Sequence, residues 1–452
     1  MKRIIVIFSV LLFASIAVAQ PQYTLEQLTD SALLHNIAMR TARHEIEAAH
    51  EQRREAYTKY FPNVSATAAT FNANRGMAKM NIDPSTMMSP ELGAALAQSF
   101  PPEALAALAS PMSMSMMKSG TIASVTALQP IYAGGQIVNG NKLAKVGEEV
   151  SELQLQLARN EVENTVSQYY WQLVSLYEKQ KTLAAVEALL ADIYKDVDVA
   201  VRAGVALRND LLQVQLRQND VESQKVKLQN GIDIVKMALG QYAGLNNSQF
   251  TINNPHPQLI TSERLSPIPT GDEAGVSRTP EYSLLQKQVE AARLQQKMAM
   301  GKQLPSVAVG AGYNYHNLLD NDRLFGMVFA TVSVPISDWW GGTHNVKHKK
   351  LQLQKAQEQL EDNAQLLNIR LQRARNEANE ARQQVVIAQR GIEQAQENLR
   401  LNRDFYRVGT AKMSDLLEAQ LLYQQACDRQ TEAFADLQHK LLLYRQAAGN
   451  GK

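Results

Sequence analysis

The sequence predicts a mainly α-helical fold with a small β part, built from a duplicated unit of helix, strand, strand, long helix and helix. Three observations support this fold class: a motif that occurs twice, two long stretches with a seven-residue apolar period, and four short alternating segments. The composition agrees, because only 6% of the 452 residues are aromatic while Gln, Ala and Leu are abundant, which is typical of long helices.

The N-terminal residues predict export from the cytoplasm. Lys2 and Arg3 precede an apolar run, Ile4–Val18, and an Ala-x-Ala site ends at Ala19. This pattern is that of a cleaved secretory signal peptide, here residues 1–19. A transmembrane anchor is the weaker alternative, because the run is shorter than the ~20 residues of a spanning helix. The residue directly after the cleavage site is not a cysteine, so we expect no N-terminal lipid.

The duplicated motif lies late in each half of the chain. Arg407–Gln420 reads RVGTAKMSDLLEAQ and Arg202–Gln215 reads RAGVALRNDLLQVQ, with seven identical positions and no gap. Two further pairs of segments match in the same order: Tyr60–Asn72 with Gln303–Tyr315, and Leu128–Gln136 with Ser333–Gly342. Matching order and similar spacing indicate an internal duplication of one structural unit.

The repeat predicts the organisation of the mature chain, with an irregular Asn-, Pro- and Ser-rich connector between two units. We expect a first repeat over 20–243, with strands about 62–75 and 119–132 and a loop at 76–118. The connector would cover 244–279. The second repeat would cover 280–452, with strands about 305–316 and 324–338, a long helix about 342–407, a turn at 408–411 and a last helix about 412–447.

Each half contains one very long helix with coiled-coil periodicity. Residues 148–203 contain neither Gly nor Pro, so they can form ~85 Å of continuous helix at about 1.5 Å per residue. Apolar residues recur every seven positions in both halves: Leu155, Val162, Tyr169, Leu176, Leu183, Leu190 and Val197, then Leu353, Leu360, Leu367, Ala374, Ala381, Ala388 and Ala395. Sustained heptads favour coiled-coil packing over an ordinary globular core.

Four short segments predict membrane strands. They begin at Pro62, Ser119, Pro305 and Leu324, and their ~10–13 residues compare with the ~9–11 of a tilted transmembrane strand. Four strands cannot close a barrel and an open edge is not tolerated in lipid, so three chains would share one twelve-stranded barrel. A small soluble sheet is the alternative. We expect Trp339, Trp340 and Tyr132 at the membrane interface, as in aromatic girdles.

These elements together resemble the TolC-like outer membrane efflux protein (outer membrane factor) family. The resemblance rests on the duplicated x-Pro strand starts, the Pro-x…Gly-Gly strand exits and the Tyr-Arg-x-Gly-x…Asp-Leu-Leu-x-Ala-Gln turn at Tyr406–Gln420. It implies a homotrimer in outer-membrane lipid of a Gram-negative bacterium, with an α-helical coiled-coil barrel projecting into the periplasm. It also implies a passive exit duct of a tripartite efflux or type I secretion system, which docks to a periplasmic adaptor (membrane fusion protein) and an inner-membrane pump of RND, ABC or MFS type.

The resemblance also implies site residues at the two turns, which form the periplasmic tip in that family. Tyr406, Asp415, Glu418 and Asp210 fall on gate or pore positions. One departure is Ala411, which stands where the family's prototype has a basic residue. The positions that adaptors would contact are Val408, Gly409, Thr410, Arg407, Gly204 and Arg202.

The residues at the turns also have an ordinary structural interpretation. Gly204 and Gly409 suit the left-handed end of a helix, and Asp210 and Asp415 suit the start of the next one. For the two aspartates, capping and a pore role carry similar weight from the sequence alone. Glu418 favours the pore role for Asp415, because a trimer would then present two rings of carboxylates.

The remaining features exclude other classes of function. A formal net charge of +2 gives no field that would favour nucleic acid, and the single Cys427 excludes a disulfide framework. No phosphate loop, nucleophile elbow or acid–base constellation occurs, so we expect no enzyme and no cofactor. A periplasmic coiled-coil adaptor or structural protein is the alternative function.

The segment 76–118 is rich in methionine, which leaves two interpretations open. We favour an extracellular surface loop, because by topology it would face outside the cell, the wrong end for capturing a substrate. The alternative is a Cu(I) site, because thioethers are soft ligands; its residues would be Met112, Met114, Met116 and Met117.

Overall fold

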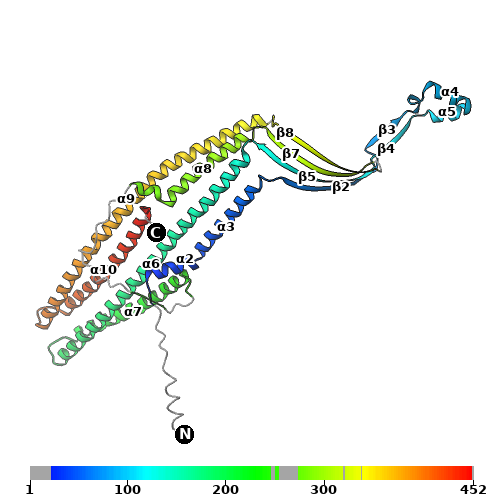
Figure 1. Cartoon of the computed structure of the whole chain (residues 1–452). Helices are drawn as coiled ribbons and strands as arrows, with labels where there is room; N and C mark the ends of the chain where they lie inside the picture. The colour runs from blue at the N-terminus through cyan, green and yellow to red at the C-terminus, as the bar shows by residue number, and fades with distance from the viewer. Residues whose placement is uncertain (1–21, 246–249, 254–272, 319–320, 337, 450–452) are drawn as a thin grey trace, which may run out of the picture. The chain divides into compact units, whose positions relative to one another are not determined.

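The computed structural model describes residues 22–245, 250–253, 273–318, 321–336 and 338–449 (Figure 1). The predicted signal peptide and much of the predicted connector lie outside these ranges. The chain divides into two compact units, and each unit combines segments from both sequence repeats. The first unit comprises 1–50, 146–290 and 354–452, and the second comprises 51–145 and 291–353.

The first repeat contributes these elements: β1 (Gln22–Tyr23), α2 (Leu25–His35), α3 (Ile37–Thr58), β2 (Asn63–Asn72), β3 (Ala78–Ile82), η2 (Pro84–Thr86), α4 (Pro90–Ser99), α5 (Pro102–Leu108), β4 (Met112–Met116), β5 (Ser119–Ala133), α6 (Gln136–Arg202) and α7 (Arg208–Tyr242). The predicted connector contains β6 (Thr251–Ile252) and η5 (Glu273–Arg278). The second repeat contributes α8 (Pro280–Gly301), β7 (Ser306–Leu318), β8 (Asn321–Ser333), α9 (Asp338–Arg407) and α10 (Met413–Ala447).

The first unit consists mainly of two long helical hairpins, α6–α7 and α9–α10 (Figure 1). Every residue of the two predicted heptad rows is buried or half-buried, so the seven-residue period does mark the packed side of each long helix. Both helices begin before the stretches in which the helical pattern was clear from the sequence, 148–203 and about 342–407. For example, α6 runs through Gly140 and Gly147, which cost a helix only about 1 kcal/mol each relative to alanine.

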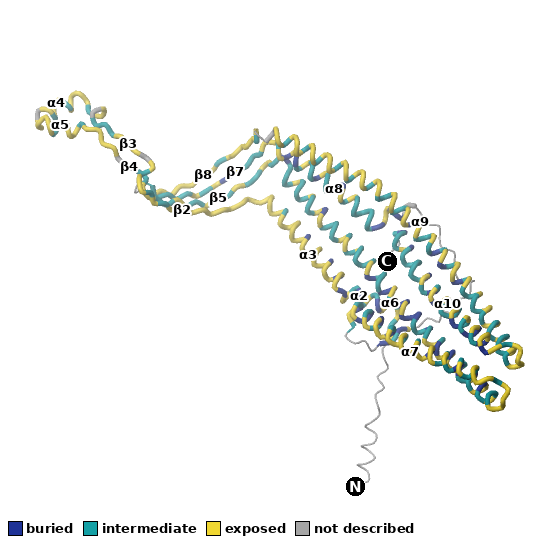
Figure 2. The backbone as a smooth tube through the Cα atoms, turned by 180° about the vertical axis from the view of Figure 1, so that it is seen from behind, coloured by how far each residue is buried: buried dark blue, intermediate teal, exposed yellow. Residues whose placement is uncertain are grey.

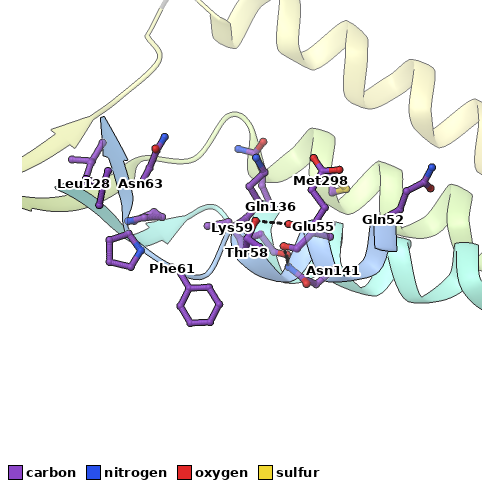
Figure 3. Close-up of a pocket in the computed structure, with 16 residues that line it drawn as sticks. Gln52, Glu55, Thr58, Lys59, Phe61, Asn63, Leu128, Gln136, Asn141 and Met298 are labelled. Carbon is purple, nitrogen blue, oxygen red and sulfur yellow. Dashed lines mark hydrogen bonds between the residues drawn. The ribbon is translucent and has the colours of Figure 1, made fainter. Parts of the chain in front are cut away.

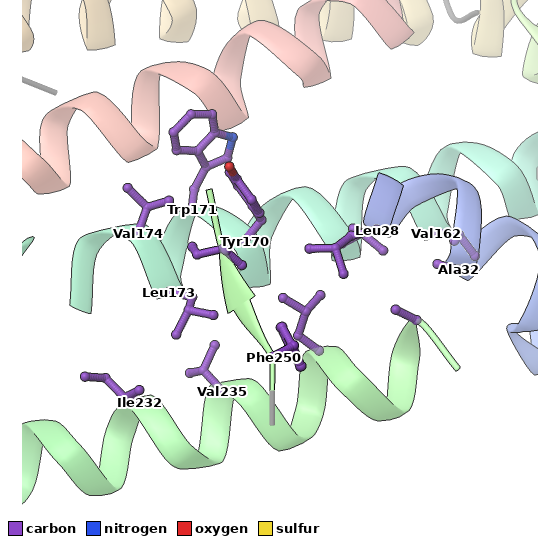
Figure 4. Close-up of a cluster of buried hydrophobic side chains, with 14 of the residues drawn as sticks. Leu28, Ala32, Val162, Tyr170, Trp171, Leu173, Val174, Ile232, Val235 and Phe250 are labelled. Carbon is purple, nitrogen blue, oxygen red and sulfur yellow. The ribbon is translucent and has the colours of Figure 1, made fainter. Parts of the chain in front are cut away.

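The largest core of the first unit joins the two hairpins to the N-terminal helix α2. Leu28 on α2 and Leu173 on α6 are completely buried in it (Figure 4), as is Leu239 on α7. Trp171 on α6 meets Phe434 on α10 edge to face, with ring centroids 5.4 Å apart. The short strands β1 and β6 pair in parallel beside this core, a small sheet that the sequence did not predict.

The second unit contains a four-stranded antiparallel sheet of order β2-β5-β7-β8. This confirms that each chain supplies four long strands. The last of them ends at Ser333 rather than at about residue 338, because α9 already begins at Asp338. Trp339 and Trp340 therefore belong to the first turn of α9 and not to the end of a strand, where the sequence placed them.

The segment 76–118 has regular structure, which the favoured interpretation as a surface loop did not include. β3 and β4 form a hairpin that continues from β2 and β5, and the short helices α4 and α5 follow at its far end (Figure 1). Ser89 caps α4 by accepting a hydrogen bond from Leu92 N, and Pro90 takes its first position. In the described part of the chain, no helix is both long and apolar enough to cross a membrane.

Candidate functional site

The two helical hairpins turn through the same local structure. Gly204 follows α6 with φ = 74° and Gly409 follows α9 with φ = 75°. In each turn the glycine N–H donates to the carbonyl oxygen three residues earlier, at 3.0 Å in the first turn and 3.1 Å in the second. The N–H of the residue after the glycine donates to the carbonyl oxygen five residues before it, at 2.9 Å in both turns. This pair of bonds is a Schellman motif, which requires a left-handed residue at the helix end and therefore favours glycine.

The glycine requirement predicts opposite effects for two alanine substitutions. Gly409→Ala should destabilise the α9–α10 turn by about 1–2 kcal/mol, because the left-handed conformation strains a side chain although no neighbouring atom obstructs it. Gly391→Ala, in the interior of α9 and equally unobstructed, should stabilise the helix by about 0.5–1 kcal/mol. Thermal unfolding of the two variants measures both effects, and shifts of the same sign would contradict this account.

Asp210 and Asp415 cap the helices that follow the turns. The Asp210 Oδ2 atom accepts a hydrogen bond from Leu207 N at 3.3 Å, and the Asp415 Oδ2 atom accepts one from Lys412 N at 3.1 Å. Both aspartates thus occupy the third helical position and reach back to the N-cap residue, rather than being the N-cap themselves. Their carboxylates also lie near the positive end of a helix, which stabilises the charge.

Tyr406 connects the second hairpin with the first. Its half-buried ring packs against an apolar cluster in which Val197 and Val214 of the first hairpin meet Met413 and Leu416 of the second. Burial raises the pKa of the Tyr406 hydroxyl, and the nearby negative charge of Asp210 raises it further. The structure therefore places Tyr406 close to Asp210, two of the four predicted gate residues.

The other two predicted gate residues are exposed on α10. Asp415 and Glu418 lie on the side of the helix opposite Met413 and Leu416, which are buried. The turns themselves are also exposed (Figure 2), including the predicted adaptor-contact residues Arg202, Gly204, Arg407, Val408, Gly409 and Thr410. Arg202 forms an ion pair of 2.6 Å with Asp198 on its own helix.

A buried polar network joins α7 and α10 next to the apolar cluster, since Arg217 lies between the cluster residues Val214 and Val221 on α7. The Arg217 guanidinium donates from Nε to Gln420 Oε1 at 3.0 Å and from Nη2 to Gln424 Oε1 at 2.9 Å. Gln424 in turn donates to Gln224 on α7 at 2.9 Å. Gln420 is completely buried, and burial lowers the pKa of Arg217 although Asp220 opposes the shift.

The four-stranded sheet has two faces of different character. The strand register aligns residues of one parity across all four strands. This face is mostly apolar and includes Val64, Val125, Tyr313, Val328 and Val332, with polar residues at the end where Thr70, Thr121, Asn317 and Asp322 align. The other face is mostly small and polar on β2, β5 and β7, with Ser65, Thr67, Ser124, Thr126 and Asn314, while β8 adds Phe325 and Met327.

The apolar face is open to solvent in the single chain. Val328 is 84% exposed, Val64 and Val332 are each 65% exposed, and Tyr313 is 62% exposed. The outer strands β2 and β8 each pair on one side only, so the sheet also has two free edges. An exposed apolar surface with free edges is unstable in water and needs further chains or lipid to cover it.

A family model described as "Outer membrane efflux protein" matches residues 28–245 and 277–450. The chain belongs to the outer membrane efflux protein family. This membership makes it a transport protein rather than an enzyme. A search of curated protein sequences found no match.

Solved structures of outer-membrane channels have the same fold as this efflux protein. VceC of Vibrio cholerae is 16% identical with a TM-score of 0.73, covering 94% of this chain and 96% of its own. CmeC of Campylobacter jejuni is 18% identical with a TM-score of 0.73, covering 94% and 86%. MtrE of Neisseria gonorrhoeae, in its open state, is 16% identical with a TM-score of 0.72, covering 94% and 89%.

One cavity of the efflux protein lies in the second unit, where α3 leads into β2. Its volume is about 860 Å³, and Figure 3 shows Glu55, Lys59 and Phe61 among its lining residues together with Gln136 and Met298. The Thr58 hydroxyl donates to the Glu55 carbonyl at 2.6 Å, which closes the last turn of α3. No group of three or more His, Cys, Asp or Glu residues that could hold a metal occurs in the described ranges.

The sequence did not identify the Arg217 network. Arg217 and Gln420 are 203 residues apart, and neither belongs to a motif that could have paired them. It also did not identify the apolar surface of the first turn, where Val205 is 79% and Leu207 70% exposed. A comparison of the two turns could have found the latter, because Leu207 stands where the second copy has Lys412.

Proposed function

We propose that this efflux protein is the passive outer-membrane exit duct of a tripartite efflux or type I secretion system. The observation that carries the proposal is the open four-stranded sheet, with one apolar face, one largely polar face and two free edges. Three such sheets make twelve strands, an even number that leaves a lumen, with the apolar faces toward lipid. The protein would therefore be a homotrimer in the outer membrane, exported with a cleaved signal peptide and without an N-terminal lipid.

Membrane fractionation tests this proposal. A duct should sediment with the outer membrane, require detergent for extraction and run as a trimer that dissociates on heating. The alternative, a periplasmic coiled-coil adaptor or structural protein, should be released from the periplasm without detergent. Recovery of a soluble monomer from the periplasm would therefore overturn the proposal.

The two turns would form the periplasmic gate of the duct. Tyr406 and Asp210 lie close together between the hairpins, while Asp415 and Glu418 are exposed on α10. In a trimer the last two residues would contribute two rings of three carboxylates to the constriction. That a channel of this fold can open is supported by MtrE, whose structure is described as an open state.

The carboxylate rings predict the ion selectivity of the duct. Asp415→Asn with Glu418→Gln should lower the preference for cations and raise the conductance in planar bilayers, because the charge is removed from the constriction. Asparagine can still accept the hydrogen bond from Lys412 N, so the substitution separates the charge from the cap. Unchanged selectivity in the double variant would refute the pore role.

The exposed turns would also contact a periplasmic adaptor that joins the duct to an RND, ABC or MFS pump. The second turn offers Val408, which is 71% exposed, between Arg407 and the Gly409-Thr410 corner. The first turn offers Arg202 and Gly204. Co-purification of an adaptor with the wild type, and its loss with Val408→Asp, would test this contact.

A further inference from the structure

The four long strands of the second unit all meet helices at the same end of the sheet. The register aligns the start of β2 with the end of β5, and the start of β7 with the ends of β5 and β8. The end of α3, the start of α6, the end of α8 and the start of α9 adjoin this end of the sheet (Figure 1); their segments are 51–59, 136–145, 291–302 and 338–350. We call these four segments the belt. At about 1.5 Å per residue, they extend about 10–18 Å along their helices.

The belt is strongly basic. It contains eleven lysine and arginine residues and only three acidic ones, which gives it a formal charge of +8, while the whole chain carries +2. At the other end of the sheet, residues 73–118 and 319–323 contain four basic and five acidic residues, so the excess of positive charge is confined to the helix end. The basic residues of the belt are Arg53, Arg54, Lys59, Lys142, Lys145, Arg293, Lys297, Lys302, Lys347, Lys349 and Lys350.

Each of the four helices also carries an exposed apolar side chain at the end nearer the sheet. These side chains are Tyr57, Val138, Met300 and Trp340, which are 58%, 45%, 52% and 81% exposed. Basic residues lie three, four or seven positions farther from the sheet, which places them on the same face of each helix. They are Arg53 and Arg54 on α3, Lys142 and Lys145 on α6, Arg293 and Lys297 on α8 and Lys347 on α9, and all of them are exposed. The order of side chains along the axis is therefore the same on all four helices.

Aromatic side chains connect the belt with the apolar face of the sheet. Tyr132 is opposite Val307, which is itself opposite Val332 of the apolar face, so the exposed Tyr132 ring lies on that face. Phe61, which precedes β2, contacts Tyr57 edge to face with ring centroids 5.6 Å apart. From the strands toward the helices, the exposed side chains thus change from aliphatic to aromatic to basic. The hydrocarbon core, the interface and the headgroup region of a bilayer favour these three classes in the same order.

We propose that the belt binds the phosphate groups of anionic phospholipids in the periplasmic leaflet of the outer membrane. The inference rests on the proposed function, because the sheet has to cross that membrane for the belt to reach its periplasmic surface. Basic side chains next to a bilayer attract anionic lipids, and the attraction decays over a Debye length of about 8 Å at physiological ionic strength. Eight of the eleven basic residues are lysines, whose stems can follow apolar surface while the ammonium group reaches the headgroups. The belt would therefore select anionic over zwitterionic lipids at this end of the barrel.

Electron spin resonance of spin-labelled lipids tests the inference. The full-length protein is reconstituted into phosphatidylcholine vesicles that contain a trace of spin-labelled phosphatidylglycerol or spin-labelled phosphatidylcholine. The motionally restricted fraction of each label gives the relative affinity of that lipid for the protein. The wild type should prefer phosphatidylglycerol about threefold at low salt, equivalent to about 0.7 kcal/mol. Salt at about 1 M, which shortens the Debye length to about 3 Å, should remove the preference.

Two variants test whether the charge of the belt causes the preference. Lys142→Gln, Arg293→Gln, Lys297→Gln and Lys347→Gln together remove charge from three of the four helices and should abolish it. Lys142→Arg, Arg293→Lys, Lys297→Arg and Lys347→Arg together retain the charge and should retain the preference. Circular dichroism and the heat-dissociable trimer verify that each variant is folded and assembled. A preference that persists in the glutamine variant overturns the inference.

A third variant distinguishes the belt from the total charge of the chain. Arg40→Gln, Arg208→Gln, Lys227→Gln and Arg390→Gln remove the same charge from exposed positions of the first unit and should leave the preference unchanged. Its loss in this variant would show that charge anywhere on the chain attracts the lipid, which contradicts the inference. Loss of the preference when inorganic phosphate replaces chloride at constant ionic strength would show that free anions occupy the belt instead.

The same spectra separate this inference from the proposed duct. Restricted lipid without a preference for phosphatidylglycerol in the wild type would overturn the inference and leave the duct intact. Absence of any motionally restricted lipid would show that the sheet does not contact the bilayer, which overturns the duct and the inference together.

Discussion

Arginine in place of Val328 is expected to abolish assembly of the protein in the outer membrane. Val328 lies near the middle of β8 on the apolar face of the sheet and is 84% exposed in the single chain. If this face contacts lipid, a buried arginine there costs about 2–4 kcal/mol near the membrane midplane, and a trimer would carry three copies. The heat-dissociable trimer should therefore almost disappear from outer-membrane fractions.

The neighbouring residue provides a matched control. Met327 is on the same strand and is 45% exposed, but it belongs to the opposite, more polar face. Met327→Arg should preserve the trimer, because that face would line a water-filled lumen. Equal loss of trimer in both variants would show that β8 tolerates no arginine, and equal retention would show that lipid does not cover the Val328 face; either result contradicts the proposed orientation.

Periodicity was sufficient to predict the long elements of this fold. The heptad rows of α6 and α9 and the alternation in β7 and β8 extend over many residues, so each pattern is specified repeatedly. Helix ends were predicted less well. The Gly- and Pro-free stretch 148–203 left the start of α6 open; α6 begins at Gln136, because packing along the helix outweighs the small cost of Gly140 and Gly147. The Gly341-Gly342 pair, which lies inside α9, was taken for a helix boundary, and this placed Trp339 and Trp340 outside the helix.

Composition misled the interpretation of residues 76–118. Methionine, alanine and proline together resemble an irregular loop, yet the segment contains local signals for regular structure. Ser89, Pro90 and Glu91 form a helix start with a cap, a first-turn proline and an acidic residue. The alternating Met112–Met116 run is a strand pattern, and its partner Ala78–Ile82 shows the same alternation of apolar and polar residues.

At the candidate gate, local sequence patterns predicted the turns but not the contacts between the two hairpins. The duplicated motif identified the turns, their glycines and the capping aspartates, because these depend on local sequence. The approach of Tyr406 to Asp210 and the bonds from Arg217 depend on how two hairpins pack, which no local pattern encodes. Ala411 illustrates the difference: its position suggested that a basic residue was missing from the tip, while a basic residue of the other hairpin, Arg217, bridges the helices farther from the turns.

Methionine in place of Arg217 is expected to loosen the tip and open the duct. The Arg217 guanidinium donates hydrogen bonds to the side-chain oxygens of Gln420 and Gln424. Gln420 is completely buried and Gln424 is 6% exposed. Removing the guanidinium leaves both oxygens buried without this donor, at a cost of about 1–3 kcal/mol each. The cost falls on the packed state in which α7 and α10 are adjacent, so a state with the hairpins apart becomes more populated.

Single-channel conductance and the sensitivity of cells to a large antibiotic such as vancomycin should therefore both rise in Arg217→Met. Arg208→Met is the matched control, because it removes the same charge from the exposed start of α7 and should change neither quantity. A triple variant of Arg217→Met, Gln420→Leu and Gln424→Leu replaces the whole network with apolar groups, which is close to neutral when both partners are removed. It should recover much of the closed state; if it conducts more than Arg217→Met alone, the network does not act as a unit that holds the hairpins together.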